Sequence, residues 1–355
     1  MAFAGKRVNI EQVEQLLASA RNLPDAKLAE KLSGLELVER ATSARLSRWQ
    51  KDFPGARTRE ALLALADASA FLDLPPTEIL PNAEPDTETL VQIYARAIAY
   101  ASKTIQKLPD FSARRTTLYF DDLSVAQRMR EKSTSDGSRV LHASGAQGVL
   151  PPGAALLRDG DASSLVVTYR DGNEVEDTES TKSKKSEARG RGLTTFGEFG
   201  PIISVVIGDA KHGKVYWSHW EQGANGPLAV FRYRVPQESS HFMVKGGGNI
   251  PQCPSYHGEI AVDPASGTIL RITLESDWKP PFQPSESNVL VEYGPVQIGN
   301  QTYTCPIKGV ALSKLPDPSA QGTNASGDMF AAQTFVNDIT FTEYHVFRAE
   351  TRILP

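Results

Sequence analysis

Two pairs of side chains have the types and the spacing that acid–base chemistry requires. His257 precedes Glu259 by two residues, and Glu343 precedes His345 by the same interval. Residues two apart in a β-strand share a face, so each pair sets an imidazole beside a carboxylate. A metal site needs three or four ligands, so these pairs predict no metal. They leave open a hydrolytic enzyme that uses one pair as acid and base.

Other catalytic motifs are incomplete or absent in this sequence. Gly208–Lys214 has most of a phosphate-binding loop, but Val215 lacks the hydroxyl that Mg²⁺ needs there, and the residues after it favour a strand where a helix must begin. The segment predicts a turn between two antiparallel strands. The chain has no Gly-x-Ser-x-Gly element. We therefore predict no catalytic residue and no cofactor.

Aromatic residues recur at alternate positions in the second half of the chain, and a glycine-rich stretch before them carries two more phenylalanines. Such residues form either the core of a sheet or an apolar, concave ligand surface. The candidates for ligand contact are Phe196, Phe199, Tyr216, Trp220, Phe231 and Tyr233.

The two cysteines, Cys253 and Cys305, are each followed by proline and end predicted strands that could be neighbours. A disulfide between them would stabilise the fold by about 3–4 kcal/mol in the chain-entropy model. The alternative is a pair of buried, unpaired thiols. Neither belongs to a CxxC pair, so zinc and thioredoxin-like chemistry are not predicted.

These residues need a scaffold, and its clearest signal is a hairpin. Two alternating runs in Tyr256–Glu275 flank the turn Asp-Pro-Ala-Ser-Gly. Asp263 can accept turn hydrogen bonds, and Gly267 can adopt positive φ. Leu270, Ile272 and Leu274 share one face of the second arm. The pattern predicts a half-buried antiparallel hairpin.

The chain divides into a helical part and a strand part. Apolar residues at helical spacing predict helices near 10–17, after Ser33, at 58–72 and at 87–108, with a proline-rich connector before the last. After Pro109 the period becomes two. The predicted strands are 114–120, 164–170, 202–207, 214–221, 229–235, 241–245, 257–262, 268–275, 288–293, 303–312 and 338–353.

Helices followed by a meander of strands predict an α+β fold with a large, curved antiparallel sheet. We expect a helical domain at residues 1–108 and a sheet domain at 109–355. Low-complexity composition predicts mobile loops near 133–160, 171–191 and 316–327.

Composition narrows the classes of partner. The chain has 355 residues, 40% of them hydrophobic, and a net charge of -4. Phosphate binding needs a basic surface, so nucleic acid is not an expected partner. No apolar run reaches the length of a transmembrane helix. Ala2–Gly5 contains the small-x-small pattern of a signal-peptidase site, which predicts that a signal peptide has been removed; chance is the alternative.

Several segments carry a resemblance. The Tyr256–Ile272 hairpin, Val291–Pro306, Phe341–Glu350 and the N-terminal runs Gly34–Arg40 and Ala64–Asp73 resemble a group of uncharacterised exported bacterial proteins. The hairpin is also similar to the half-barrels of the lipoprotein-carrier (LolA/LolB) and RseB type, which fold an open sheet around a helix and bind acyl chains or partner proteins. These resemblances imply export to the periplasm or outside the cell, and export favours the disulfide.

The expected function is a non-enzymatic, exported binding protein. It would use a concave sheet face for an apolar, lipid-like ligand or for a protein partner. The alternatives are the hydrolytic enzyme and an interaction scaffold that works through the N-terminal helices.

Overall fold

The computed structural model describes residues 6–103, 108–122, 157–158, 162–170, 173–176, 193, 195, 197–244, 251–278, 286–316 and 332–346. Most of the three expected mobile loops lies outside these residues. Short strands occupy 157–158, within the loop expected at 133–160, and 173–176, within the loop expected at 171–191. The first residue of the loop expected at 316–327 is the last residue of the strand Gln301–Pro316. Phe196 also lies outside the described residues.

The N-terminal part is a compact group of helices with its own core. It contains β1 (Lys6–Val8), α1 (Ile10–Ser19), α2 (Asp25–Ser33), β2 (Leu35–Leu37), α3 (Ser43–Asp52) and α4 (Ala56–Ala68), and β1 pairs in parallel with β2. Asn9 and Gln12 form a capping box that starts α1. The run after Ser33, predicted as one helix, is wrong in part: it forms β2 first, and α3 begins only where Thr42 caps it.

The described strands that follow α4 form one antiparallel sheet. Its strands are β3 (Phe111–Asp121), β4 (Leu157–Arg158), β5 (Ser163–Arg170), β6 (Asn173–Glu176), β7 (Lys214–Gly223), β8 (Gly226–Val235), β9 (Ser255–Val262), β10 (Ile269–Asp277), β11 (Glu286–Ile298), β12 (Gln301–Pro316) and β13 (Ala332–Val346). Their spatial order is β6-β5-β3-β13-β12-β11-β10-β9-β8-β7, with β4 beside β3. The α+β class and the antiparallel hairpin are confirmed: Asp263 accepts the turn hydrogen bonds, and Gly267 has φ +76°. The prediction that the hairpin is half-buried is wrong, because consecutive residues of β10, Arg271 to Leu274, are all buried.

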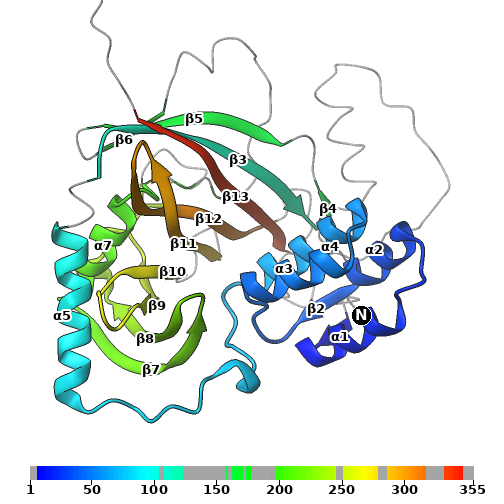
Figure 1. The fold of residues 1–355 in the computed structure, drawn as a ribbon, viewed down its shortest axis with the longest axis horizontal. Coiled ribbons are helices and arrows are strands. Elements are labelled where there is room, and N and C mark those ends of the chain that lie inside the picture. Colours follow the sequence, from blue (N-terminus) through cyan, green and yellow to red (C-terminus); the bar gives the residue numbers. More distant parts are fainter. Residues whose placement is uncertain are drawn as a thin grey trace, which may run out of the picture.

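Helices cover both faces of this sheet (Figure 1). On one face, α5 (Thr87–Lys103) and α7 (Pro201–Ala210) share a large core with β8–β11. On the other, α4 packs on a smaller core that includes Leu290, Val310 and Val336. The sheet bends between the two groups of helices. Because α5 shares its core with strands, the predicted helical domain of residues 1–108 contains two groups of helices with different cores; the boundary itself stays a prediction.

Two predicted strands are wrong. Residues 202–207 belong to α7, which begins at Pro201, and Ile203, Val206, Ile207 and Ala210 are buried at helical spacing. A short apolar run fits a strand and a buried helix equally well, and proline in the first turn favours the helix. The turn at 208–214 therefore joins a helix to a strand. At 241–245, the described residues form only the bridge between Val244 and Gln252.

The disulfide prediction is also wrong, because both cysteines are free. Cys253 lies just before β9, and Cys305 lies on β12, with β10 and β11 between these strands. Neighbouring strands are about 4.8 Å apart, so three steps across the sheet exceed the Cα separation that a disulfide spans. Cys305 is buried in an aromatic core instead.

Candidate functional site

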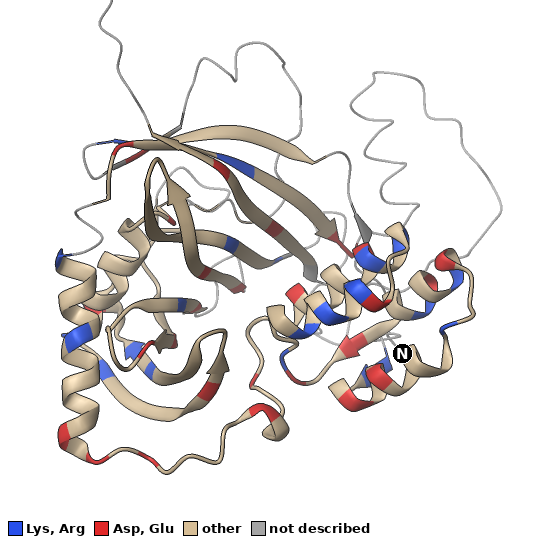
Figure 2. Cartoon of the chain, in the orientation of Figure 1, with Lys and Arg blue, Asp and Glu red and all other residues tan. Residues whose placement is uncertain are grey.

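The sheet face that meets the N-terminal helices is rich in charged and polar side chains. Strand register places Arg271, Glu292 and Lys308 side by side across β10–β12. Further along, a second row runs from His257 through Glu275, Asn288 and Leu312. Charged residues of both signs occur on these strands and on the N-terminal helices (Figure 2). The first row is closed over by the helices, and the second borders a cavity.

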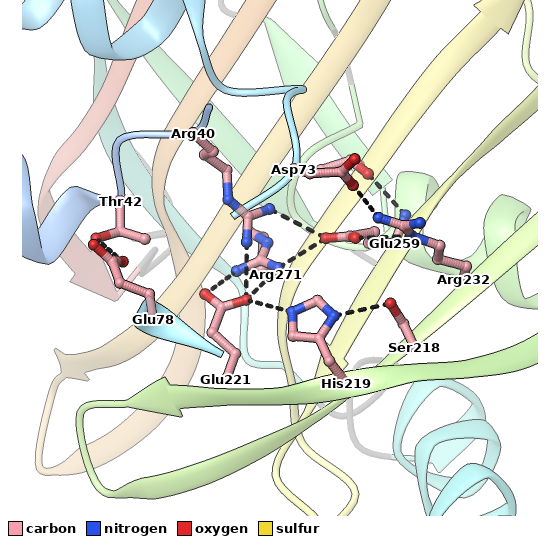
Figure 3. Close-up of polar contacts among 11 residues, drawn as sticks. Arg40, Thr42, Asp73, Glu78, Ser218, His219, Glu221, Arg232, Glu259 and Arg271 are labelled. Atoms are coloured by element: carbon pink, nitrogen blue, oxygen red, sulfur yellow. Dashed lines mark hydrogen bonds and ion pairs between the residues drawn. The ribbon is translucent and has the colours of Figure 1, made fainter. Parts of the chain in front are cut away.

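The N-terminal group of elements from β1 to α4 is called the helical region. A buried network of ion pairs joins this helical region to the sheet (Figure 3). Arg40, between β2 and α3, donates to Glu221 at 2.9 Å and to Glu259 at 3.1 Å. Arg271 forms a two-pronged contact with Glu221 at 2.6 and 2.7 Å. This geometry is the strong, bidentate form of the arginine–carboxylate pair.

Arg232 completes the network at its outer edge. It pairs with Glu259, and it contacts Asp73 in the chain that follows α4. Three arginines thus face three carboxylates: Arg40, Arg232 and Arg271 against Asp73, Glu221 and Glu259. The arginines hold the pKa of Glu221 and of Glu259 below the ordinary value despite burial. The network is neutral, and it fixes the helical region in place.

Two further polar contacts cross the same interface. Lys308 on β12 donates to Asp67 on α4 at 2.6 Å and lies 3.4 Å from Asp338 on β13. Ser43 at the start of α3 donates to Glu292 at 2.7 Å. Burial raises the pKa of Asp67, while the carboxylates raise that of Lys308. The helical region is therefore held by specific polar contacts as well as by apolar packing.

Beside this interface lies a cavity of about 630 Å³. One wall comes from the helical region and is largely apolar. Its apolar residues are Leu32, Leu35, Leu37, Ala61, Ala64, Leu65, Ala68, Phe71 and Leu72. The opposite wall comes from the sheet and is largely polar. Its polar residues are Asp122, His257, Glu275, Ser276, Glu286, Asn288, Lys314 and Thr334. The volume falls in the range of small-molecule sites, and the two walls suit a molecule with an apolar and a polar side.

Glu275 is the most perturbed group on the polar wall. Burial, together with the nearby Glu259 and Asp277, raises its pKa to about 7, while Arg232 opposes the shift. His257, its cross-strand neighbour, lies 3.9 Å from Glu275 and 3.1 Å from Asp277. The imidazole therefore stands between two carboxyl groups at one end of the cavity.

The residues predicted for ligand contact do not gather at this cavity. Phe199 is packed in the aromatic core with Phe111 and Phe341, and Phe231 and Tyr233 are buried in the core beneath α5 and α7. Tyr216 is exposed on β7, and the ring nitrogen of Trp220 donates to the carbonyl of Ala83. None of these five borders the cavity, although their role in binding stays a prediction.

The two His–Glu pairs are placed differently from each other. His257 borders the cavity, but Glu259 is engaged by arginines. Glu343 has φ 51° at an irregularity of β13 and pairs with Arg114 at the surface. Neither Glu343 nor His345 borders the cavity.

Sequence reasoning missed the cavity and the ion-pair network. The network joins residues that are far apart in the chain: Arg40, Glu221 and Arg271. Each is a charged residue of a type that usually lies at the surface, so the sequence alone does not mark it as buried. One signal was present: Arg271 interrupts a strand whose other residues near it are apolar or β-branched, and such a charge is expected to be paired where the strand is covered on both faces.

One other arrangement of side chains could support chemistry. Ser218 Oγ lies 2.8 Å from His219 Nδ1, and His219 Nε2 lies 3.8 Å from Glu221, but neither Ser218 nor His219 borders the cavity. Within the described part of the chain, no three His, Cys, Asp or Glu side chains are grouped as metal ligands. No helix there is long and apolar enough to cross a membrane.

Comparisons with known proteins add no relative. No protein-family model, no curated protein and no solved structure matches this chain.

Proposed function

We propose that this protein binds an amphiphilic small molecule in the cavity between its helical region and its sheet. The observation that carries the proposal is the pairing of an apolar helical wall with a polar strand wall around about 630 Å³. A ligand with an alkyl or ring body and a polar end matches both walls. The proposal keeps the expected binding role, but it moves the apolar surface from the sheet to α4 and its neighbours.

Export stays part of this proposal. It is supported by the resemblance to exported proteins, while the free cysteines remove the disulfide from its support. The interaction scaffold remains an alternative, in which the helical region would contact another protein.

The binding role is tested by filling the cavity. The neutral fluorescent probe N-phenyl-1-naphthylamine should bind the protein, with a gain in emission as it leaves water. Ala68 lies on the apolar wall, so Ala68→Phe should abolish that gain by occupying the space. Ala56, the exposed first residue of α4, provides the control: Ala56→Phe adds the same side chain outside the cavity and should bind the probe as the parent does. Equal binding by both variants, or none by the parent, would refute the proposal.

Hydrolysis remains a second proposal because of one observation. His257 borders the cavity, and its Nδ1 lies near a carboxylate of Asp277, as in a general base that activates water. A panel of nitrophenyl esters tests it. Turnover that disappears in His257→Gln would support the enzyme, and absence of turnover across the panel would eliminate it.

A further inference from the structure

The polar wall of the cavity carries more negative than positive charge. Among the described residues that border it, Lys314 is paired with Glu286 at 2.7 Å, and Arg7 lies opposite Glu36 in the β1–β2 register. Apart from Lys314 and Glu286, the polar wall holds two carboxyl groups, Asp122 and Glu275, and one imidazole, His257. Lys314 is the one lysine or arginine among the described residues of the polar wall, so an anionic ligand would meet a cation there that is already paired with Glu286.

The two surplus carboxyl groups lie at opposite ends of the wall. Glu275 is on β10 and Asp122 follows β3, with β11, β12 and β13 between them. One small head group cannot contact both, since each strand step spans about 4.8 Å. Asp122 also accepts a hydrogen bond from the amide of Thr334. Glu275 is thus the better candidate for recognition of a ligand.

Few positive charges lie near the partly buried carboxyl group of Glu275. Its ion-pair neighbour in the described structure is His257, at 3.9 Å, and that imidazole is shared with Asp277. Glu259, Asp277 and Asp73 add negative charge nearby, and Arg232 supplies the opposing cation. A cation that enters the cavity beside Glu275 would offset this repulsion and the cost of burial.

We propose that the ligand is an amphiphile with a cationic head, such as a primary alkylammonium, and that Glu275 is the counter-ion that selects it. The alkyl chain would lie against the apolar wall formed by α4 and its neighbours. This inference rests on the proposed binding function, because it assigns the head group of the molecule held in that cavity.

A series of ligands of equal length tests the selection. Decylamine, decanol and decanoate are titrated at pH 8 and low micromolar protein as competitors of N-phenyl-1-naphthylamine. Decylamine should compete at least about tenfold more strongly than decanol, and decanoate should be the weakest. In Glu275→Gln the advantage of the amine should shrink by about tenfold, while decanol is unchanged.

Glu343→Gln provides the matched control, since it makes the same chemical change at a surface residue that does not border the cavity. It should retain the preference for the amine. If the probe binds and Ala68→Phe blocks it, but decanoate competes as well as decylamine or Glu275→Gln leaves the preference intact, the cationic head is wrong and the cavity stands. If the probe does not bind, or Ala68→Phe leaves its binding intact, the binding function itself is wrong.

Discussion

Arg40→Met tests whether the buried ion-pair network holds the helical region on the sheet. The Arg40 side chain is only 6% exposed and contacts Glu221 and Glu259. Its removal leaves a network of two arginines and three carboxylates, so one buried negative charge loses its counterpart. Removal of one partner from a buried ion pair costs about 3–5 kcal/mol.

The lower end of that range is expected here, for two reasons. Arg271 still contacts both carboxylates after the substitution. Burial and the adjacent Arg271 also lower the pKa of Arg40, which shows that part of the cost of burying this cation is not recovered. We therefore expect a loss of about 3 kcal/mol in the free energy of unfolding.

Urea unfolding, followed by far-ultraviolet circular dichroism and by tryptophan fluorescence, measures this loss. Arg114→Met is the control, because Arg114 and its partner Glu343 are both about half exposed, at 44% and 54%. The control should cost less than about 1 kcal/mol. Glu221→Gln combined with Arg40→Met restores the balance of charge, and the two losses should be less than additive by about 1 kcal/mol. An Arg40→Met loss equal to that of the control would refute the reasoning.

Three other perturbations have defined outcomes. The pKa of Glu275 is raised to about 7 from 4.5, so the folded protein should lose stability as pH rises from about 4.5 to 7. Glu275→Gln should remove that loss and gain up to about 3 kcal/mol in the free energy of unfolding at pH 8. Urea unfolding of both proteins at pH 5 and pH 8 measures this, and the same pH dependence in both would contradict it. Lys308→Met should cost about 3–5 kcal/mol because it strands the carboxylate of Asp67 in the interface, and a loss under 1 kcal/mol in urea unfolding would contradict this. Thiol titration without reductant should find two free thiols in denaturant and one in the native protein, since Cys305 is buried with its pKa raised to about 12 while Cys253 is partly exposed; no free thiol in denaturant would show a disulfide.

The parts of the fold that the sequence predicted are those set by local pattern. The period-two runs and the turn at Asp263–Gly267 predicted the hairpin, because alternation and turn chemistry act between residues close in the chain. The prediction for 202–207 was wrong because this short run, five apolar residues and Ser204, shows no clear period. Pro201 in the first turn favours the helix, and the packing of α7 against the core of the sheet stabilises it.

The candidate site could not be predicted from local sequence patterns, because its walls come from segments separated by some two hundred residues. Ala68 on α4 and Glu275 on β10 border one cavity only after the helical region packs on the sheet. The predicted disulfide between Cys253 and Cys305 was wrong for a related reason. The prediction placed their strands as neighbours, but the order of strands in the sheet sets β10 and β11 between them.

The most direct test of the central claim is a crystal structure of the protein with decylamine at pH 8. The account predicts density for the alkyl chain between α4 and the β11–β12 part of the sheet, with the nitrogen within hydrogen-bond distance of the Glu275 carboxyl group. Decylamine bound elsewhere on the molecule, with this cavity empty, would contradict the account.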